Sequence, residues 1–243
     1  MPVRACPVDR RPWPARAATT LTRPLTGSLS RYLSGQAARP HGPAGRALAR
    51  IWVSETAAVN DAALDLLAPR SGETVLEIGF GPGRALATLA AAGARVIGVD
   101  VSPAMLAVAS RRNAGLLADG RLDLHLGDGA TLPAPDSSVD AVLAVHTIYF
   151  WPDPAGTLTE AARVLRPGGR LVLAFRAGDH PLPRRFDPAV YHVPTIEQAT
   201  RWLGTAGFTD IQTHTRAEAA PTVVWLTAAT PAHALSVADH DVT

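Results

Sequence analysis

Residues 75–83 read VLEIGFGPG, an apolar run that ends in three closely spaced glycines. The run from Thr74 to Ile78 predicts a buried β-strand, and Arg84–Ala92 predicts a helix that Gly93 ends. Glycine allows a tight turn and lets the backbone approach a ligand with no Cβ atom in the way. The stretch therefore indicates a strand–turn–helix unit with a ligand at the turn, although ordinary turn chemistry is an alternative.

Strands and helices alternate along the rest of the chain. Further strands are predicted at Arg95–Val99, Leu122–Leu126, Val139–Val145, Arg170–Phe175, Thr209–Thr213 and Thr222–Ala228, and further helices at Pro103–Asn113, Pro154–Leu165 and Thr195–Thr205. Residues 166–169, Arg-Pro-Gly-Gly, are interpreted as a structural turn. Short, almost continuously apolar strands separated by helices are typical of a mostly parallel sheet covered on both faces. We therefore expect an α/β, doubly wound fold.

The N-terminal region has a different composition from the rest. Its first 31 residues carry six arginines and a single acidic residue, Asp9, whereas the whole chain has a net charge of only +2. We predict a disordered Arg- and Pro-rich tail over residues 1–43 and one domain over residues 44–243. A helical pattern from Ala44 to Leu67, with a break at Ser54, begins that domain. Because the domain is mildly acidic, we expect no nucleic-acid partner.

The composition excludes several kinds of chemistry. All 23 basic residues are arginine, so a P-loop lysine and a Schiff-base lysine are impossible. The one cysteine, Cys6, excludes an internal disulfide and a cysteine-based metal site. No apolar run is long enough for a membrane span, and the N-terminus lacks the apolar core of a secretory signal. We expect a cytoplasmic protein without a metal.

Asp100 directly follows the second predicted strand, 21 residues after Gly79. A carboxylate there can accept hydrogen bonds from both ribose hydroxyls of an adenosine-containing ligand, although it can also cap the helix that follows Ser102. Together with the glycine turn, this pattern fits a nicotinamide dinucleotide or S-adenosylmethionine.

The residues around the turn discriminate between these two ligands. Pyrophosphate binding is typical of G-x-G-x-x-G, whereas this chain reads G-x-G-x-G and continues with Arg84. Glu77, just before the turn, would repel a pyrophosphate but suits a ligand with an ammonium group and a sulfonium. Local electrostatics therefore favour the methyl donor.

The chain resembles the class I S-adenosylmethionine-dependent methyltransferases, in the group called methyltransferase type 11. The resemblance extends from about Arg70 to Phe208 and rests on five segments in order: VLEIGFGPG, VIGVDVSPAML (residues 96–106), HLGDGATLP (125–133), DSSVDAVLAVH (136–146) and EAARVLRPGGRLVL (160–173). It implies a Rossmann-like, seven-stranded sheet in the order 3-2-1-4-5-7-6 with one antiparallel strand. It also implies S-adenosylmethionine as the cofactor.

The resemblance assigns the cofactor-binding residues. Gly79, Gly81 and Gly83 would line the methionine part and the ribose, with Glu77 supporting that end. Asp100 would hold the ribose hydroxyls. The adenine would contact Val101, Met105, Asp128, Gly129 and Ala130.

His146, just past the fourth strand, would face the donor and the acceptor. Family members usually have a polar residue there, often Asn. We consider His146 either as a general base for a hydroxyl acceptor or as a cofactor contact. Tyr149 either lines the acceptor pocket as a second catalytic candidate or only packs.

Several acceptor classes are disfavoured. No Asn/Asp-Pro-Pro-Tyr motif follows the fourth strand, no core cysteine is available for C5-cytosine methylation, and Asp153 is the only carboxylate near the site where a catechol-type metal would bind. We therefore predict methyl transfer to a small molecule: a natural-product hydroxyl or amine, a quinone or a lipid headgroup. Residues 44–67 and 177–194 are expected to form a lid over the acceptor.

Two other functions stay open from the sequence. One is a nicotinamide-dependent dehydrogenase, and the other is a non-catalytic S-adenosylmethionine-binding module. The sequence does not predict the oligomeric state.

Overall fold

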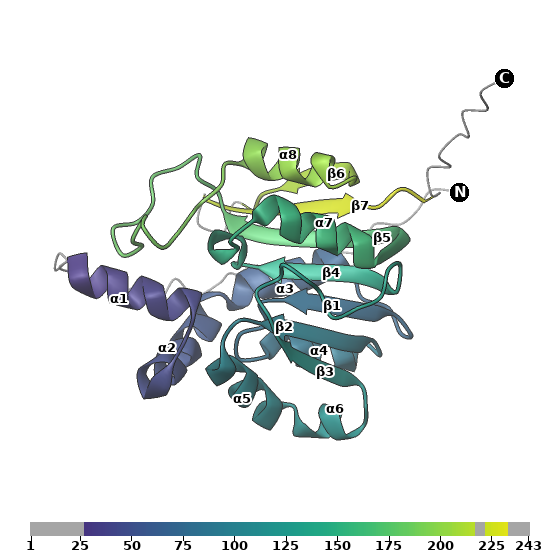
Figure 1. Cartoon of the computed structure of the whole chain (residues 1–243), viewed down its shortest axis with the longest axis horizontal. Coiled ribbons are helices and arrows are strands. Elements are labelled where there is room, and N and C mark those ends of the chain that lie inside the picture. Colours follow the sequence, from purple (N-terminus) through teal and green to yellow (C-terminus); the bar gives the residue numbers. More distant parts are fainter. Residues whose placement is uncertain (1–26, 217–221, 233–243) are drawn as a thin grey trace, which may run out of the picture.

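A seven-stranded sheet forms the centre of the computed structural model, which describes residues 27–216 and 222–232 (Figure 1). The strands are β1 (Thr74–Ile78), β2 (Arg95–Asp100), β3 (Leu122–Leu126), β4 (Val139–Val145), β5 (Leu165–Arg176), β6 (Thr209–His214) and β7 (Val223–Ala229). Their order is β3-β2-β1-β4-β5-β7-β6. Only β7 runs antiparallel to its neighbours. The predicted doubly wound sheet and its strand order are confirmed.

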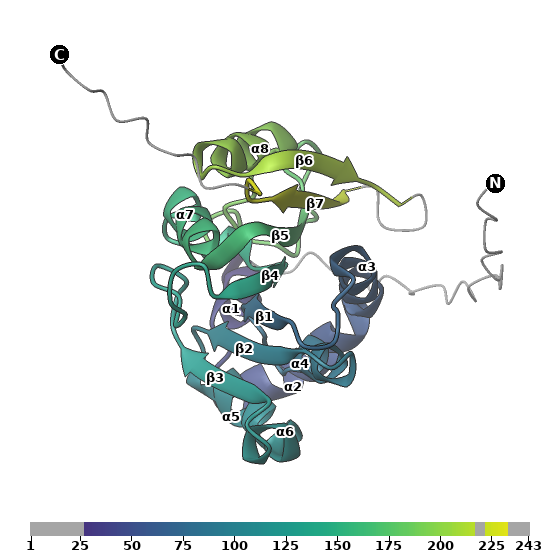
Figure 2. The ribbon, with the colours of Figure 1, turned by 90° about the vertical axis from the view of Figure 1, so that its right-hand side faces the viewer.

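Helices cover both faces of the sheet (Figure 2). They are α1 (Gly27–Ala38), α2 (Gly42–Glu55), α3 (Ala57–Leu67), α4 (Arg84–Ala91), α5 (Pro103–Arg112), α6 (Ala114–Ala118), α7 (Pro154–Val164) and α8 (Ile196–Thr205), with a 3-10 turn, η1, over Ile148–Phe150. Apolar residues of α3, α4 and α5 pack on one face, and those of α7 and α8 pack on the other. The inward-facing residues of the strands complete two apolar layers, which hold the sheet rigid beneath the loops at its edges.

The N-terminal region departs from the prediction. Helix α1 lies within residues 1–43, which were expected to be disordered, whereas residues 1–26 lie outside the described part of the chain. The reason is that α1 buries polar side chains, Ser30, Ser34 and Gln36, so it has no apolar stripe for a sequence pattern to detect. The predicted break at Ser54 is found at Thr56, between α2 and α3.

Residues 166–169 are part of strand β5 and do not form a separate turn, so that prediction was wrong. The strand pairing jumps from Val139–Leu165 to Ala141–Arg170, which leaves these four residues as an irregularity of β5 opposite β4. Gly168 has a φ of +75°. Glycine is needed there because other residues adopt this conformation at a cost.

An ion-paired clamp on β5 joins the sheet to α3. The guanidinium of Arg170 donates to the carbonyl oxygens of Leu67 at 2.6 Å and Ala68 at 3.0 Å. It also pairs with both carboxylate oxygens of Glu73, at 2.9 and 2.7 Å. These bonds lower the pKa of Glu73, opposing the effect of its partial burial. The clamp fixes the end of α3 just before β1.

The parallel strands β1 to β5 end at one edge of the sheet, on the left in Figure 1. Helix α1 and the segment 177–194, which connects β5 to α8, gather at that edge. In open α/β sheets, ligands bind in the crevice beyond the carboxyl ends of the strands. The ligand site is therefore expected at this edge.

Candidate active site

The three glycines after β1 adopt conformations that favour glycine. Their φ angles are +77° at Gly79, +53° at Gly81 and +78° at Gly83. A Cβ atom on Gly79 would lie 2.1 Å from Cγ2 of Thr147, and one on Gly83 would lie 2.8 Å from Nδ2 of Asn113. A Cβ atom on Gly81 would meet no protein atom within 4 Å. Gly79 and Gly83 are thus fixed by packing, while Gly81 borders open space at the tip of the turn.

Asp100, at the end of β2, holds this turn in place. Its Oδ2 accepts a hydrogen bond from the N–H of Gly81 at 2.8 Å, and its Oδ1 accepts one from the N–H of Ser102, also at 2.8 Å. Burial raises the pKa of Asp100, and the two N–H groups oppose that shift. Each carboxylate oxygen has more than one acceptor position, so both retain capacity for ribose hydroxyls.

Ser102, and not Asp100, caps helix α5. Its Oγ accepts a hydrogen bond from the N–H of Met105 at 3.2 Å and donates one to the carbonyl oxygen of Pro40 at 2.5 Å. The alternative reading of Asp100 as the helix cap is therefore wrong. The bond to Pro40 also ties the connection between α1 and α2 to the end of β2.

Two buried polar groups beside the glycine turn lack partners. Among the described residues, Oε2 of Glu77 and Oγ1 of Thr147 accept and donate no hydrogen bond. Burial, together with the nearby charge of Asp100, raises the pKa of Glu77 to about 8. A buried carboxyl without a partner is costly, so this site is incomplete without a ligand that supplies hydrogen-bond donors or positive charge. These two oxygens can accept hydrogen bonds from the ammonium end of S-adenosylmethionine.

The turn after β3 lies beside Asp100, because the N–H of Gly127 donates to the Asp100 carbonyl oxygen at 3.0 Å. Asp128 is exposed, and its Oδ1 accepts from the N–H of Ala130 at 3.0 Å. Gly129 between them has a φ of +88°. The predicted adenine-binding turn is therefore adjacent to the predicted ribose-binding carboxylate.

The other two residues assigned to the adenine differ in accessibility. Val101 is partly exposed beside Asp100, whereas the side chain of Met105 is buried in the core layer of α3, α4 and α5. Their contacts with adenine stay predictions.

His146 follows β4 in a left-handed backbone conformation, with a φ of +56°. Its N–H donates to the carbonyl oxygen of Ala174 at 2.7 Å, and its Nδ1 lies 2.8 Å from the hydroxyl of Tyr149. That hydroxyl accepts from the N–H of Arg176 at 2.5 Å, so its own proton is directed to Nδ1. The neutral ring then carries its proton on Nε2.

The surroundings of His146 disfavour its protonation. Burial, with a smaller contribution from the Arg176 charge, lowers the pKa of His146 to about 4. The ring is therefore neutral across the physiological range and is a weak base.

Tyr149 is almost completely buried, at 3% exposure. Its ring packs edge-to-face on Phe150 at 5.6 Å between centroids and lies 5.4 Å from the ring of Tyr191. Burial raises the pKa of Tyr149, so the phenol stays protonated. The hydroxyl is fully engaged by His146 and Arg176, which makes Tyr149 a positioning residue for His146.

Helix α1 and the segment 177–194 contact one another at the site edge. Ser30 donates to the carbonyl oxygen of Arg185 at 3.1 Å, the Oγ of Ser34 accepts from the N–H of Asp187 at 2.9 Å, and Arg31 pairs with Asp187 at 3.2 Å. These polar contacts form a cover made of two segments distant in the sequence.

The predicted lid is therefore only partly correct. Segment 177–194 lies at the site edge as expected, but α3, the second half of residues 44–67, packs against the sheet through Ala62, Ala63 and Leu67. The helical spacing of apolar residues within 44–67 does not show whether a helix covers the site or packs in the core. We call the pair formed by α1 and segment 177–194 the cover.

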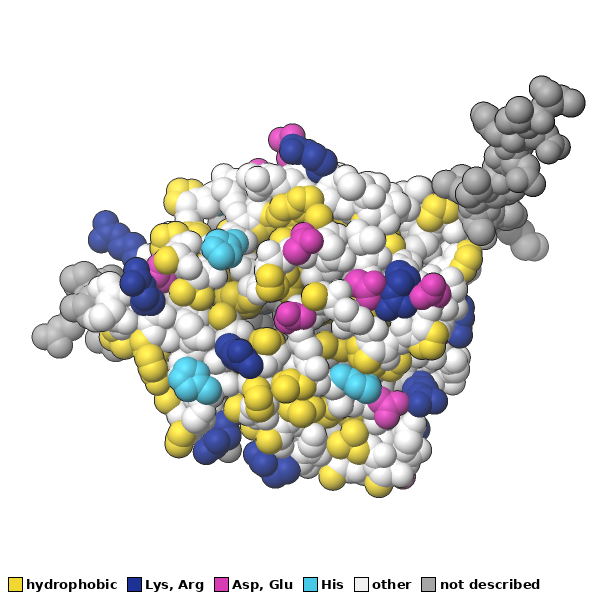
Figure 3. All heavy atoms as spheres, viewed as in Figure 1, with side chains coloured by type: hydrophobic (Ala, Val, Ile, Leu, Met, Phe, Trp, Pro, Cys, Tyr) yellow, Lys and Arg dark blue, Asp and Glu magenta, His cyan; other side chains and the backbone are white. Residues whose placement is uncertain are grey.

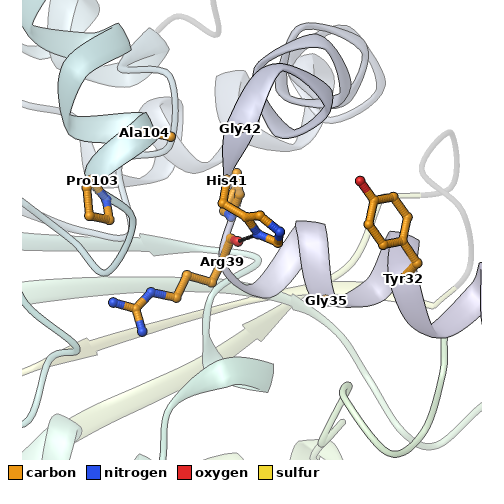
Figure 4. Close-up of a pocket in the computed structure, with 8 residues that line it drawn as sticks. Tyr32, Gly35, Arg39, His41, Gly42, Pro103 and Ala104 are labelled. Carbon is orange, nitrogen blue, oxygen red and sulfur yellow. Dashed lines mark hydrogen bonds between the residues drawn. The ribbon is translucent and has the colours of Figure 1, made fainter.

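An open cavity of about 630 Å³ lies where the cover meets α5. Figure 4 shows Tyr32 on α1, Arg39 and His41 at the α1–α2 connection, and Pro103 at the start of α5. The cavity adjoins the turn that follows Asp100, but neither the glycine turn nor His146 lines it. It borders the candidate site and is not its centre.

The described surface carries charges of both signs (Figure 3). On the face drawn in Figure 3, arginine side chains are scattered among acidic and apolar ones. Within residues 27–216 and 222–232, no group of three or more His, Cys, Asp or Glu residues is arranged to hold a metal ion. In that part of the chain, no helix has the length and apolarity needed to cross a bilayer.

Comparison with known proteins gives the family. A family model described as a methyltransferase domain matches residues 76–173. Over 173 residues, the chain is 32% identical to the demethylmenaquinone methyltransferase of Clavibacter sepedonicus, covering 60% of this chain and 69% of that protein. The chain belongs to the class I S-adenosylmethionine-dependent methyltransferases.

A second relative and a solved structure agree with this family. The methyltransferase is 40% identical over 132 residues to the demethylmenaquinone methyltransferase of Tropheryma whipplei, covering 54% of this chain and 52% of that protein. A chain from the complex between the Haloferax volcanii Trm112 methyltransferase activator and its methyltransferase shares the fold, with a TM-score of 0.68 and 21% identity, covering 82% of this chain and 97% of that chain. The chain spans about half the length of most curated relatives it matches.

The family membership confirms the predicted class of protein and its cofactor, S-adenosylmethionine. The structure brings Glu77, Gly81, Asp100 and His146 to one edge of the methyltransferase sheet, as the sequence predicted. Sequence reasoning missed Thr147 and Arg176. Thr147 directly follows His146, but a single Thr carries no pattern, and Arg176 resembles any charged residue that ends a strand.

Proposed function

We propose that this methyltransferase transfers the methyl group of S-adenosylmethionine to a small-molecule acceptor at a hydroxyl or amine group. The observation that supports this most directly is the buried, unpartnered carboxyl of Glu77 beside an open glycine turn. A nicotinamide dinucleotide would place a pyrophosphate near that carboxyl and keep it protonated, so the dinucleotide would bring no positive charge to pair with Glu77. A ligand with an ammonium group and a sulfonium would instead complete the site.

Each part of the site has a separate role in this proposal. Asp100 would accept hydrogen bonds from the ribose hydroxyls while it holds the Gly81 N–H. Glu77 and Thr147 would hold the ammonium end, and the turn at Asp128 would hold the adenine. When bound, S-adenosylmethionine supplies an electrophilic methyl group. The chain's contribution is to orient the acceptor in line with that group and to exclude water.

His146 would act through Nε2–H as a hydrogen-bond donor at the edge where the acceptor arrives. Tyr149 fixes this arrangement by donating to Nδ1. Methyl transfer breaks the sulfur–carbon bond, forms an oxygen–carbon or nitrogen–carbon bond and releases a proton from the acceptor. Because the pKa of His146 is lowered to about 4, the imidazole is poorly suited to take that proton.

The relatives support a small acceptor. Two of them are named demethylmenaquinone methyltransferases, which places a quinone among the acceptor classes to test first. A cytoplasmic location and the absence of a nucleic-acid partner belong to this proposal as well.

Cofactor binding and turnover test the proposal. Calorimetry should show binding of S-adenosylmethionine and none of NAD. Asp100→Ala should weaken S-adenosylmethionine binding about a hundredfold, since hydrogen bonds to a charged group contribute roughly 1.5–3 kcal/mol each. Asp123→Ala is the matched control, because Asp123 on β3 forms an exposed ion pair with Arg95 on β2 and lies outside the candidate site.

Turnover separates the enzyme from a non-catalytic module. The protein is incubated with methyl-labelled S-adenosylmethionine and with a panel of demethylated quinols, phenols and amines. Label in any small molecule supports the proposed function. Tight cofactor binding with no labelled product across the panel and a metabolite extract would favour the non-catalytic module, and preferential NAD binding would favour the dehydrogenase.

A further inference from the structure

Arg176 is a half-buried cation that has no carboxylate partner among the described residues. It ends β5, two residues after Ala174, which accepts the hydrogen bond from the His146 N–H. Within residues 27–216 and 222–232, its guanidinium has one hydrogen-bond partner, Oγ1 of Thr222, and no ion pair. A guanidinium has five N–H donors, so most of them have no partner among these residues.

A second arginine increases the positive charge at this place. Arg176 and Arg185 both lie over the ring of Phe186, with guanidinium carbons 5.6 and 5.0 Å from its centroid. Arg185 forms a long pair with Glu55 at 3.4 Å between exposed side chains. Such exposed pairs contribute little, so the two cations repel one another with weak compensation. Partial burial, with Arg185 nearby, lowers the pKa of Arg176.

Aromatic side chains stand beside the two guanidinium groups. Tyr191 lies 4.9 Å from Phe150 and 4.8 Å from Phe186 between ring centroids, in both cases edge-to-face. All three rings are partly exposed. They form a surface with an apolar face and a positive margin, next to the tyrosine that positions His146.

We propose that Arg176, assisted by Arg185, binds an anionic group of the methyl acceptor, either a carboxylate or a phosphate. The apolar body of the acceptor would lie against Phe150, Phe186 and Tyr191. Arginine suits this role because its planar guanidinium binds carboxylate and phosphate through two parallel hydrogen bonds. This inference rests on the proposed function for the direction from which an acceptor approaches. It adds that the acceptor carries a negative charge and that its apolar part contacts aromatic side chains.

Small probes of matched shape test the subsite without knowledge of the acceptor. Benzoate, phenylphosphonate and the neutral benzamide are titrated by calorimetry into the full chain, with and without S-adenosylhomocysteine. The wild-type chain should prefer at least one anion to benzamide by about tenfold or more, because hydrogen bonds between charged groups are roughly twice as strong as neutral ones. Preference between benzoate and phenylphosphonate distinguishes carboxylate from phosphate as the natural group.

Substitutions test whether Arg176 is the source of the preference for anionic probes. Arg176→Met should weaken anion binding about tenfold or more while leaving benzamide and S-adenosylhomocysteine binding unchanged. Arg185→Met should have a smaller effect, and Arg176→Lys should retain part of the preference. Arg201→Met is the matched control, since Arg201 pairs with Glu197 on the exposed side of α8.

The outcomes separate this inference from the proposed function. A wild-type chain that binds benzamide as well as the anions, or binds none of the three probes, overturns the anion subsite, and so does an Arg176→Met variant that keeps the wild-type preference. The wild-type comparison decides the question even where the variant fails to fold. Failure of S-adenosylhomocysteine to bind contradicts the proposed function alone, because the titrations without it still report on Arg176.

Discussion

The carboxyl group of Glu77 is mostly protonated at neutral pH in the free protein, because burial and Asp100 raise its pKa to about 8. A cation bound beside it would favour the ionised form, so cofactor binding at pH 7 should release up to one proton. Calorimetric binding enthalpies measured in phosphate and in Tris should therefore differ. Glu77→Gln should remove that difference, whereas the control Glu197→Gln, on the exposed side of α8, should retain it.

The same group gives a pH dependence of stability. An unfolded glutamate loses its proton near its ordinary pKa of 4.5, and the folded one near 8. Between these values the native state holds one more proton than the unfolded state, so the free energy of unfolding falls as the pH rises. Glu77→Gln should lack this component. If the free energy of unfolding changed equally with pH in both proteins between these two pKa values, the environment assigned to Glu77 would be contradicted.

His146 gives a prediction about conformation and chemistry together. Asparagine tolerates a positive φ, so His146→Asn should keep the free energy of unfolding, whereas the β-branched His146→Val should lower it by about 1–3 kcal/mol. With a turned-over acceptor, His146→Asn should reduce kcat by less than about tenfold and leave the acidic limb of the pH–rate profile in place. A loss of about a hundredfold or more, with the limb abolished, would restore His146 as the base.

At the residue level, sequence reasoning succeeded where a residue type and a strand end coincide. Gly81 and Asp100 were predicted because parallel strands deliver their last residues to one edge, and the hydrogen bond between them confirms their proximity. Arg176 also lies at such an edge, but the role proposed for it depends on having no carboxylate neighbour among the described residues. That property belongs to the packed structure and cannot be read from the residue itself.

The cover offers a prediction at the level of elements. Ser30→Ala with Ser34→Ala removes two hydrogen bonds to segment 177–194 and leaves the N–H of Asp187 without a partner. Each such bond contributes roughly 1 kcal/mol, so the loss of two should increase local opening by about thirtyfold. Trypsin should then cut after Arg184 or Arg185 faster than in the wild-type chain. Thr159→Ala on α7, which loses one exposed hydroxyl bond, is the control, and equal cleavage rates would contradict the cover.

Helices and strands could be predicted from the sequence where their apolar residues recur at a regular spacing. Strands β1, β3 and β4 were predicted with their observed bounds. Helix α1 was missed because its contacts to segment 177–194 are polar, and α6 because five residues are too few for a helical pattern. In both cases tertiary contacts, and not local pattern, decide the structure.

At the scale of the whole molecule, Arg170 joins the helical layer to the sheet. Arg170→Met would leave Glu73 and the carbonyl oxygens of Leu67 and Ala68 without their donors. We expect the free energy of unfolding to fall by about 2–4 kcal/mol, measured by urea denaturation at pH 7. The difference should shrink in acid, because the lowered pKa of Glu73 makes its contribution disappear once that group is protonated. Arg201→Met should change stability by less than about 0.5 kcal/mol.

The hydrogen bond from Ser102 to the Pro40 carbonyl has a consequence for kinetics. The same short turn holds Asp100 at the ribose position and anchors the connection between α1 and α2. When the methyl donor binds, it should order this turn. The same event would order one end of the cover, beneath which the acceptor is expected to lie. Reciprocal linkage then makes each of the two substrates strengthen the binding of the other. In steady-state kinetics, the apparent KM for each substrate should therefore fall as the concentration of the other is raised.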